Sequence, residues 1–502
     1  MDGDLVRQLE ELHVFHMDKL GLDDQLLEFH GEQLVSLGLH LSWSRRIDPA
    51  VADILVQFSH LSTLKIAGQL ISFPEIVYQL PALKILDLSY NAIDLIPDTI
   101  NQLQRLQELR LTGNRLSQVS AALAELSQLS HLDLSDNQLA SLPEDIWQMP
   151  CLRHIDLSNN QIDQQIEIAA PQLQECNLSN NIIKQCPHFT HPLQHLHTLN
   201  LSQNYITTLS PSLVHLTALQ HLVLTHNLID DLSEIRSRVS LRTLEVGENQ
   251  LYNLPALDQL QEVERLNIAY NNLETLPPSI CQLSKLVHLN AAHNQIMTVD
   301  NQLSELINLQ YLNLRGNQIR TIELDAIQLH DLELVDLADN QLTDIPASLF
   351  SLPSLTHLIL EDNQISSIPA EIQQLQQLKG LWLAYNRLRY LPDSICQLAN
   401  LETLWLNNNQ LRELPGELGN LDLTTLTLYD NHLAQLPTSL HQMNRLHNLQ
   451  IQNNNFSDLD LNFITSQQFN SILLGNNPLT EVFKDKLRAL KRLGPLQTKI
   501  YL

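Results

Sequence analysis

Cysteine is scarce in this chain. The 502 residues include five cysteines, an odd number, and none has the spacing of a metal-ligand motif. Disulfides concentrate in secreted proteins, where cysteines usually occur in even numbers. The sequence therefore predicts a protein with reduced thiols and gives no reason to expect a cofactor.

Long apolar runs are also missing. The first twenty residues carry Asp, Glu and His throughout, so they lack the apolar core of a signal peptide. No later stretch approaches the roughly 20 apolar residues that a membrane-spanning helix needs. We therefore expect a cytoplasmic protein with no membrane insertion. The alternative is a protein exported into a host cell without a cleavable signal peptide.

Positive charge is the third deficit. Lys and Arg number 29 against 56 Asp and Glu, which gives a formal net charge of −27. Binding to the phosphate backbone requires a basic surface, so this balance argues against a nucleic-acid partner. It is compatible with a basic protein partner, although acidity also simply keeps a long protein soluble.

What the chain does contain is a repeat. An asparagine recurs about every 23 residues in the frame Leu-x-x-Leu-x-Leu-x-x-Asn-x-Leu, eighteen times from Asn91 to Asn477, and Gln69 takes the same place one repeat earlier. A fixed period of this size indicates one supersecondary unit stacked many times. We therefore expect a solenoid of about 19 repeats.

The repeat that begins at Leu378 illustrates the expected unit. Leu381 and Leu383 alternate with other residues at a period of two, which predicts a short strand with one face buried. The following Leu-Pro and Ile-x-x-Leu segment favours a turn of helix or 3-10 helix on the opposite side. Asn386 ends the strand, where its amide can satisfy backbone groups that the bend would leave buried and unpaired.

These motifs resemble the leucine-rich repeat proteins over residues 61–479. The period and the Leu-Pro-x-x-Ile-x-x-Leu segment look like the Ras-group class, which includes intracellular scaffolds and many bacterial proteins. The resemblance implies an α/β solenoid, a horseshoe with a concave parallel β-sheet and convex segments that are short helical, 3-10 or extended. It also implies that partner proteins bind on the concave face.

The two ends of the chain look different from the repeats. We expect residues 1–60 to form an N-terminal cap, with a helix over residues 2–20 and a degenerate first repeat near Leu34–Leu39. Residues 480–502 are expected to form a C-terminal capping helix, with Thr480 as its N-cap, and a tail. The Leu-Pro signature is lost at 161–171, 232–239 and 296–323, which indicates a local change of curvature or a second binding surface there.

Three apolar residues interrupt the polar column between the inward leucines. Ile359, Trp382 and Trp405 occupy this column in consecutive repeats, within the segment from Leu355 to Leu433. Exposed aromatic side chains ringed by polar groups are typical of binding hot spots. The rings could instead simply stack on each other and stiffen the sheet. The predicted partner-binding residues are Ile359, Glu361, Trp382, Tyr385, Arg387, Trp405, Asn407 and Tyr429.

Histidines recur at another exposed strand position. They are His131, His154, His221, His288 and His357. Two of them lie beside aspartates, so His131, Asp133, His154 and Asp156 are weak candidates for a metal site or an acid–base pair. Because Asp is common at this position and an open sheet excludes little water, a pH-dependent interface is the better interpretation.

Together these features predict a non-enzymatic scaffold that binds partner proteins through its concave sheet and needs no cofactor. The alternative is a bacterial effector that uses the same surface on host proteins, and a third possibility is metal- or pH-dependent binding through the histidine column. An enzyme would require a compact pocket with converging polar groups, which this repeat does not predict.

Overall fold

The computed structural model describes residues 36–40, 46–47, 49–235, 240–257, 259–466, 470–492 and 499–501. The helix expected over residues 2–20 lies outside these ranges. The repeats fall into two compact units, and the boundary in the sequence lies between Gln250 and Leu251. We call them unit 1 and unit 2.

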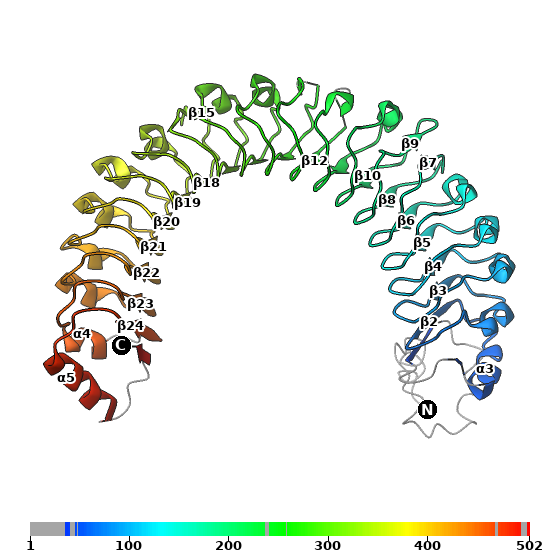
Figure 1. Cartoon of the computed structure of the whole chain (residues 1–502), viewed down its shortest axis with the longest axis horizontal. Coiled ribbons are helices and arrows are strands. Elements are labelled where there is room, and N and C mark those ends of the chain that lie inside the picture. Colours follow the sequence, from blue (N-terminus) through cyan, green and yellow to red (C-terminus); the bar gives the residue numbers. More distant parts are fainter. Residues whose placement is uncertain are drawn as a thin grey trace, which may run out of the picture. The chain divides into compact units, whose positions relative to one another are not determined.

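Unit 1 is built on a parallel sheet to which each repeat adds one short strand (Figure 1). Neighbouring strands are in register, so each inward leucine lies opposite its counterpart in the next repeat. The strands are β1 (Ser36–His40), β2 (Thr63–Ala67), β3 (Ile85–Asp87), β4 (Glu108–Arg110), β5 (His131–Asp133), β6 (His154–Asp156), β8 (Glu175–Asn177), β10 (Thr198–Asn200), β11 (His221–Val223) and β12 (Thr243–Glu245).

Unit 2 has the same construction. Its strands pair in parallel and in register from repeat to repeat. They are β13 (Arg265–Asn267), β14 (His288–Asn290), β16 (Tyr311–Asn313), β18 (Leu334–Asp336), β19 (His357–Ile359), β20 (Gly380–Trp382), β21 (Thr403–Trp405), β22 (Thr425–Thr427), β23 (Asn448–Gln450), β24 (Ser471–Leu473) and β25 (Lys499–Tyr501). The parallel solenoid predicted from the 23-residue period is confirmed.

The core of each unit is a stack of aliphatic side chains. Leu381 and Leu383 are both fully buried, as are the equivalent leucines of the neighbouring repeats. The residue between them, Trp382, lies on the opposite face of the strand and is only half-buried. We call this outward side of the strands the sheet face, and it carries the side chains that vary between repeats.

The asparagine of each repeat fixes the bend after the strand. The Asn386 Nδ2 group donates to the carbonyls of Leu360, Leu383 and Ala384 at 2.8, 3.2 and 3.2 Å, and its Oδ1 accepts from the Ile365 N–H at 2.9 Å. The next asparagine makes the same set of bonds. These buried amides satisfy backbone groups that no strand partner reaches, as expected from the sequence.

In most repeats, the residue before the repeat asparagine has a left-handed backbone conformation. Tyr385, for example, has a φ of 56°, and Gly113 and Gly316 occupy the same position with φ of 65° and 68°. Glycine is the residue that adopts this conformation without steric cost, yet the repeats mostly place Asn, Asp, His or Tyr here. The conformation turns these side chains out at the edge of the sheet face.

The convex side, opposite the sheet, is made mainly of short 3-10 helices (Figure 1). Several begin directly after a proline, as at Pro369 and Pro392. In unit 1 they are η2 (Glu75–Gln79), η3 (Asp98–Gln102), η4 (Ala121–Glu125), η5 (Glu144–Gln148), η6 (Pro211–His215) and η7 (Ser233–Ile235), preceded by helix α3 (Pro49–Val56). In unit 2 they are η8 (Pro278–Gln282), η9 (Asn301–Glu305), η10 (Ala347–Ser351), η11 (Ala370–Gln374), η12 (Asp393–Gln397), η13 (Leu418–Asn420) and η14 (Thr438–Gln442).

Two of the segments without a Leu-Pro signature form extended pairs on the convex side. In unit 1, β7 (Glu167–Ile168) pairs with β9 (His188–Phe189). In unit 2, β15 (Thr298–Val299) pairs with β17 (Thr321–Ile322). In these two pairs the extended backbone hydrogen-bonds to the neighbouring repeat. The third segment contains η7, and residues 236–239 lie outside the described part of the chain.

The C-terminal part of unit 2 contains the expected helix and one further strand. After α4 (Leu461–Ser466), helix α5 (Glu481–Arg492) buries Phe483 and Leu487, and the Phe483 N–H donates to Thr480 Oγ1 at 3.2 Å. Strand β25 then pairs in parallel with β24, where the sequence indicated only a tail. In the described residues no helix has the length and apolar character required to span a bilayer. The division at residues 60 and 480 stays a prediction.

Candidate binding surfaces

Ile359, Trp382 and Trp405 lie side by side on the sheet face of unit 2. The register of β19, β20 and β21 places Ile359 opposite Trp382, and Trp382 opposite Trp405. Ile359 and Trp382 are half-buried, and Trp405 is 37% exposed. We call these three residues the aromatic stripe. It is an apolar strip on a face whose equivalent positions elsewhere are mostly polar.

The Trp382 ring is held in place by its own strand and by the strand beside it. An ideal Cβ on Gly380 would lie 2.1 Å from Trp382 Cη2, so the indole covers this glycine. The ring also stacks on His357, with centroids 5.7 Å apart, and meets Trp405 edge-on at 6.2 Å. Both arrangements are favourable for aromatic pairs. Gly380 and His357 are therefore positioning residues that reasoning from sequence did not identify.

Of the residues predicted to surround the aromatic stripe, all except one are at least partly accessible. Tyr385 and Arg387 are exposed, and Glu361 and Tyr429 are half-buried. Asn407 is only 3% exposed, so the prediction that it lies on the accessible surface is wrong.

Hydrogen bonds with its neighbours hold the Asn407 side chain down. Its Oδ1 accepts from the Thr427 hydroxyl at 2.8 Å, and its Nδ2 donates to Asn408 Oδ1 at 3.1 Å. Nothing in the residue type reveals this, because asparagine is common at exposed strand positions as well.

Carboxylates gather next to the stripe. Burial raises the pKa of Asp336, which lies opposite Ile359 in the neighbouring strand. Burial also raises the pKa of Glu361, and Asp362 and Asp336 raise it further. The pKa of Asp362 is raised by burial and by Asp339. These shifts show a concentration of negative charge that is poorly compensated by solvent or by cations.

Tyrosine and histidine rings form two more stacks on unit 2. Tyr270 and His293 stack with centroids 4.2 Å apart, and His288 and Tyr311 with centroids 3.9 Å apart. The His293 ring covers Gly316, because an ideal Cβ there would lie 2.3 Å from its Nδ1. The sequence signal, an aromatic residue followed one repeat later by glycine in the same column, was available but was not recognised.

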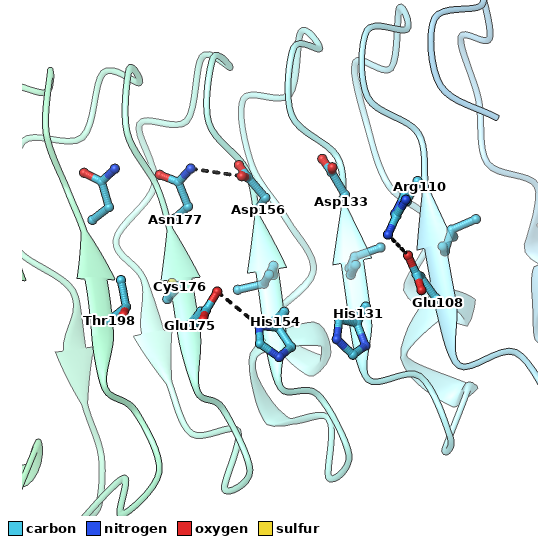
Figure 2. Close-up of a pocket in the computed structure, with 14 residues that line it drawn as sticks. Glu108, Arg110, His131, Asp133, His154, Asp156, Glu175, Cys176, Asn177 and Thr198 are labelled. Atoms are coloured by element: carbon cyan, nitrogen blue, oxygen red, sulfur yellow. Dashed lines mark hydrogen bonds and ion pairs between the residues drawn. The ribbon is translucent and has the colours of Figure 1, made fainter. Parts of the chain in front are cut away.

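The histidine candidates in unit 1 lie in a shallow open hollow of about 390 Å³ on the sheet face (Figure 2). His131 and His154 project side by side from β5 and β6, and their rings stack with centroids 4.3 Å apart. Glu108 pairs with Arg110 on one side, and His154 Nδ1 lies 3.2 Å from Glu175 Oε2 on the other (Figure 2). Burial and the neighbouring His154 lower the pKa of His131.

The metal interpretation of these residues is not supported. The part of the chain that the structure describes contains no group of three or more His, Cys, Asp or Glu side chains placed to hold a metal ion. Asp133 Oδ1 and Asp156 Oδ1 instead accept bonds from serine hydroxyls of their own repeats, at 2.7 and 2.6 Å. The two carboxylates thus stabilise the turns after their strands by hydrogen bonding, and the two imidazoles stack on each other.

The other column histidines have separate neighbours. His221 Nδ1 lies 3.1 Å from the Thr243 hydroxyl, His288 stacks on Tyr311 and His357 on Trp382. Burial and the nearby Arg265 lower the pKa of His288. The register of repeats thus places the histidines in one column without making them one cluster.

This stack of short parallel strands is a repeat solenoid. Its outward side chains vary between repeats, which is typical of repeat proteins that bind other proteins. A leucine rich repeat family model matches residues 59–116, 104–162, 171–234, 307–365, 330–388 and 353–411, which is more than half of the chain. A two-copy version matches residues 284–326, and a single-repeat version matches 262–283. The chain belongs to the leucine-rich repeat family, whose fold is a protein–protein interaction scaffold and whose members are generally non-enzymatic.

Solved structures of the same fold come from several kinds of organism. YopM from Yersinia enterocolitica WA-314 is 23% identical, with 89% of this chain and 88% of that chain covered and a TM-score of 0.64. The Arabidopsis receptor kinase HAESA, solved with the peptide hormone IDA and the co-receptor SERK1, is 26% identical, with 82% and 73% covered and a TM-score of 0.60.

A curated relative matches over a short segment. It is an adenylate cyclase of Schizosaccharomyces pombe, 34% identical over 107 residues. The aligned segment is 21% of this chain and 6% of the cyclase. Because the chain spans so little of that protein, the likeness concerns the repeats and carries no cyclase activity.

Proposed function

We propose that this protein binds partner proteins through the sheet face of unit 2, with the aromatic stripe as the main contact. The observation that carries the proposal is the placement of two tryptophans, in register, on a face whose equivalent positions are mostly polar. Tryptophan is among the residues most enriched at binding hot spots. Trp382 is held by Gly380 and His357, so little side-chain entropy would be lost when a partner binds.

The likeness to HAESA supports a protein or peptide as the ligand. That receptor was solved with a peptide hormone and a co-receptor protein bound. The likeness to YopM, at 23% identity, concerns the fold alone and does not favour export into a host. The five cysteines are free thiols, which supports a reducing compartment such as the cytoplasm.

The test compares single alanine variants in partner capture and in affinity. Trp405→Ala should weaken partner binding by about 2–4 kcal/mol, the range of a hot-spot tryptophan. It should cost about 0.5–1 kcal/mol of stability, because it removes the edge-on contact with Trp382. Trp382→Ala should weaken binding similarly and cost about 1–2 kcal/mol of stability, because the Trp382 ring also stacks on His357.

Tyr390 provides the matched control. It is an exposed aromatic side chain, at 54%, in the same repeat as Trp382 but past the bend that follows the strand. Tyr390→Ala should retain every partner. If Trp405→Ala and Tyr390→Ala retain the same partners with the same affinities, the sheet face of unit 2 is not the binding surface.

A further inference from the structure

The carboxylates beside the aromatic stripe lack the cation that an equivalent carboxylate has elsewhere. In unit 1, Asp87 occupies the same strand position as Asp336 and makes an ion pair with Lys65 at 2.9 Å. Burial opposes ionisation of Asp87, but hydrogen bonds from Ser89 and Lys65 lower its pKa overall. At Asp336 the pKa is raised instead. The same site in the repeat is thus neutralised in unit 1 and left negative in unit 2.

Arg315 is the arginine whose positive charge acts on all three carboxylates, Asp336, Glu361 and Asp362. It lowers the pKa values of Asp336, Glu361 and Asp362, but burial and the other carboxylates outweigh it. Across the described ranges, no ion pair joins any of these three carboxylates to a Lys, Arg or His side chain. The free protein therefore holds several partly desolvated negative charges near Ile359, at one end of the aromatic stripe.

The column that contains Glu361 leaves room beside its carboxylate. The residues at the equivalent position in the adjacent repeats are Ala338 and Ala384, both buried and both small. Ile359 lies two residues before Glu361, and Trp382 lies opposite Ile359 in the next strand. Ile359 thus lies between Glu361, two residues further along the chain, and Trp382, in the next strand. No long side chain of the flanking repeats covers Glu361 in its column.

We propose that the partner segment bound by the aromatic stripe is basic, with an arginine or lysine side chain whose stem lies on the stripe at Ile359 and whose charge is bound by Glu361. This inference rests on the proposed function and specifies the chemistry of the partner. The aliphatic stem of such a side chain covers the apolar stripe, and its cation is bound by the Glu361 carboxylate. Asp336 is only 8% exposed and accepts a hydrogen bond from the Ala338 N–H, so it adds negative charge without contacting the partner. A net charge of −27 also favours the approach of a basic partner.

The experiment selects ligands without assuming their sequence. A phage library of random peptides is panned on the full chain, and the enriched peptides are synthesised with a fluorescent label. Their affinities are measured by fluorescence anisotropy for the wild type, Trp405→Ala, Glu361→Gln and the control Tyr390→Ala. For each peptide that contains a basic residue, a version with citrulline in place of arginine, or norleucine in place of lysine, is measured as well.

We expect the peptides that lose binding to Trp405→Ala to be enriched in arginine and lysine. Replacing the key arginine by citrulline, or Glu361 by Gln, should weaken binding about tenfold, the size of one charge-assisted hydrogen bond. Combining the two changes should weaken binding no further than either alone, because each removes the same interaction.

The possible failures are distinguishable. Peptides that depend on Trp405 but contain no enriched basic residue, or that bind Glu361→Gln as tightly as wild type, overturn the basic-partner inference and leave the proposed function standing. Peptides that are enriched but bind Trp405→Ala as well as wild type overturn both. Basic peptides whose binding depends on Glu361 but not on Trp405 contradict the stripe as the contact.

Discussion

Gly380→Ala should displace the Trp382 ring without removing any aromatic side chain. An ideal Cβ at residue 380 would lie 2.1 Å from Cη2 and 2.3 Å from Cζ3 of the indole. Separations this short are far below van der Waals contact, so the ring has to leave its place over the strand. The substitution therefore tests the position of the ring separately from its presence.

The expected effect on stability is small because two terms oppose each other. Moving the ring breaks its stacking on His357, 5.7 Å away, at a cost of about 0.5–1.5 kcal/mol. Replacing glycine by alanine reduces the entropy of the unfolded chain and stabilises by about 0.4–1 kcal/mol where the backbone conformation suits alanine. Gly380 lies in strand β20 with no positive φ, so this gain applies. The free energy of unfolding should change by less than about 1 kcal/mol.

The expected effect on binding is large. If the partner binds Trp382 where it now lies, a rotated ring loses most of a hot-spot contribution of about 2–4 kcal/mol, which corresponds to roughly 30- to 1000-fold in affinity. Affinity for a peptide selected on the wild type can be measured by fluorescence anisotropy, and stability by calorimetry. Exciton circular dichroism of the edge-on Trp382–Trp405 pair reports directly whether the ring has moved.

Gly416 supplies the control. It lies in the same unit, and an added Cβ there meets no atom within 4 Å. Gly416→Ala should leave affinity and exciton signal unchanged and should show only the gain in stability of about 0.4–1 kcal/mol that comes from the unfolded chain. Wild-type affinity in Gly380→Ala, together with a lost exciton signal, would refute the reasoning, because the ring would then bind the partner from another position or not at all.

Further predictions concern stability. Gly419→Ala should cost at least about 2 kcal/mol, because an added Cβ would lie 1.8 Å from the Ser439 carbonyl oxygen, and denaturant unfolding would show it. At neutral pH, Asp87→Asn should destabilise by about 0.5 kcal/mol since it removes a charge whose pKa is lowered by folding, whereas Asp336→Asn should stabilise since that pKa is raised. Both effects should vanish in acid, where the wild-type carboxyls are protonated. Asn386→Ala should cost about 3–5 kcal/mol, measurable by hydrogen exchange of the adjacent repeats, because it leaves buried backbone groups unpaired.

The fold was predictable because each repeat solves the same physical problem. The spacing of leucines fixes which side chains face the core, and the asparagine marks the bend, so strand and turn follow from one repeat. The convex side was harder, since the same loss of Leu-Pro at residues 161–171 and 296–323 gave strand pairs that sequence periodicity did not specify. Strand β25 was not predicted because it has only three residues, too few to give a periodic signal.

The candidate site was only partly predictable. The column assignment placed Trp382 and Trp405 on the sheet face because the side-chain direction in a strand alternates strictly. Whether a polar side chain at such a position is free depends on its neighbours. Asn407 is held by Thr427 one repeat later, and the sequence gives no sign that this pair forms. The charge excess near Glu361 likewise depends on burial, which a single repeat does not reveal.

Glycines leave space for several of the aromatic rings on the sheet face. Gly113, Gly316 and Gly380 each lie beneath a ring, from Tyr90, His293 and Trp382 respectively. Two of these glycines are left-handed and could be explained by the backbone alone, but Gly380 has ordinary strand geometry. The absence of a side chain at Gly380 therefore leaves space for the indole ring of Trp382. A residue that departs from the repeat is best interpreted together with the neighbour that makes room for it, and Gly380 with Trp382 is such a pair at the centre of the proposed binding surface.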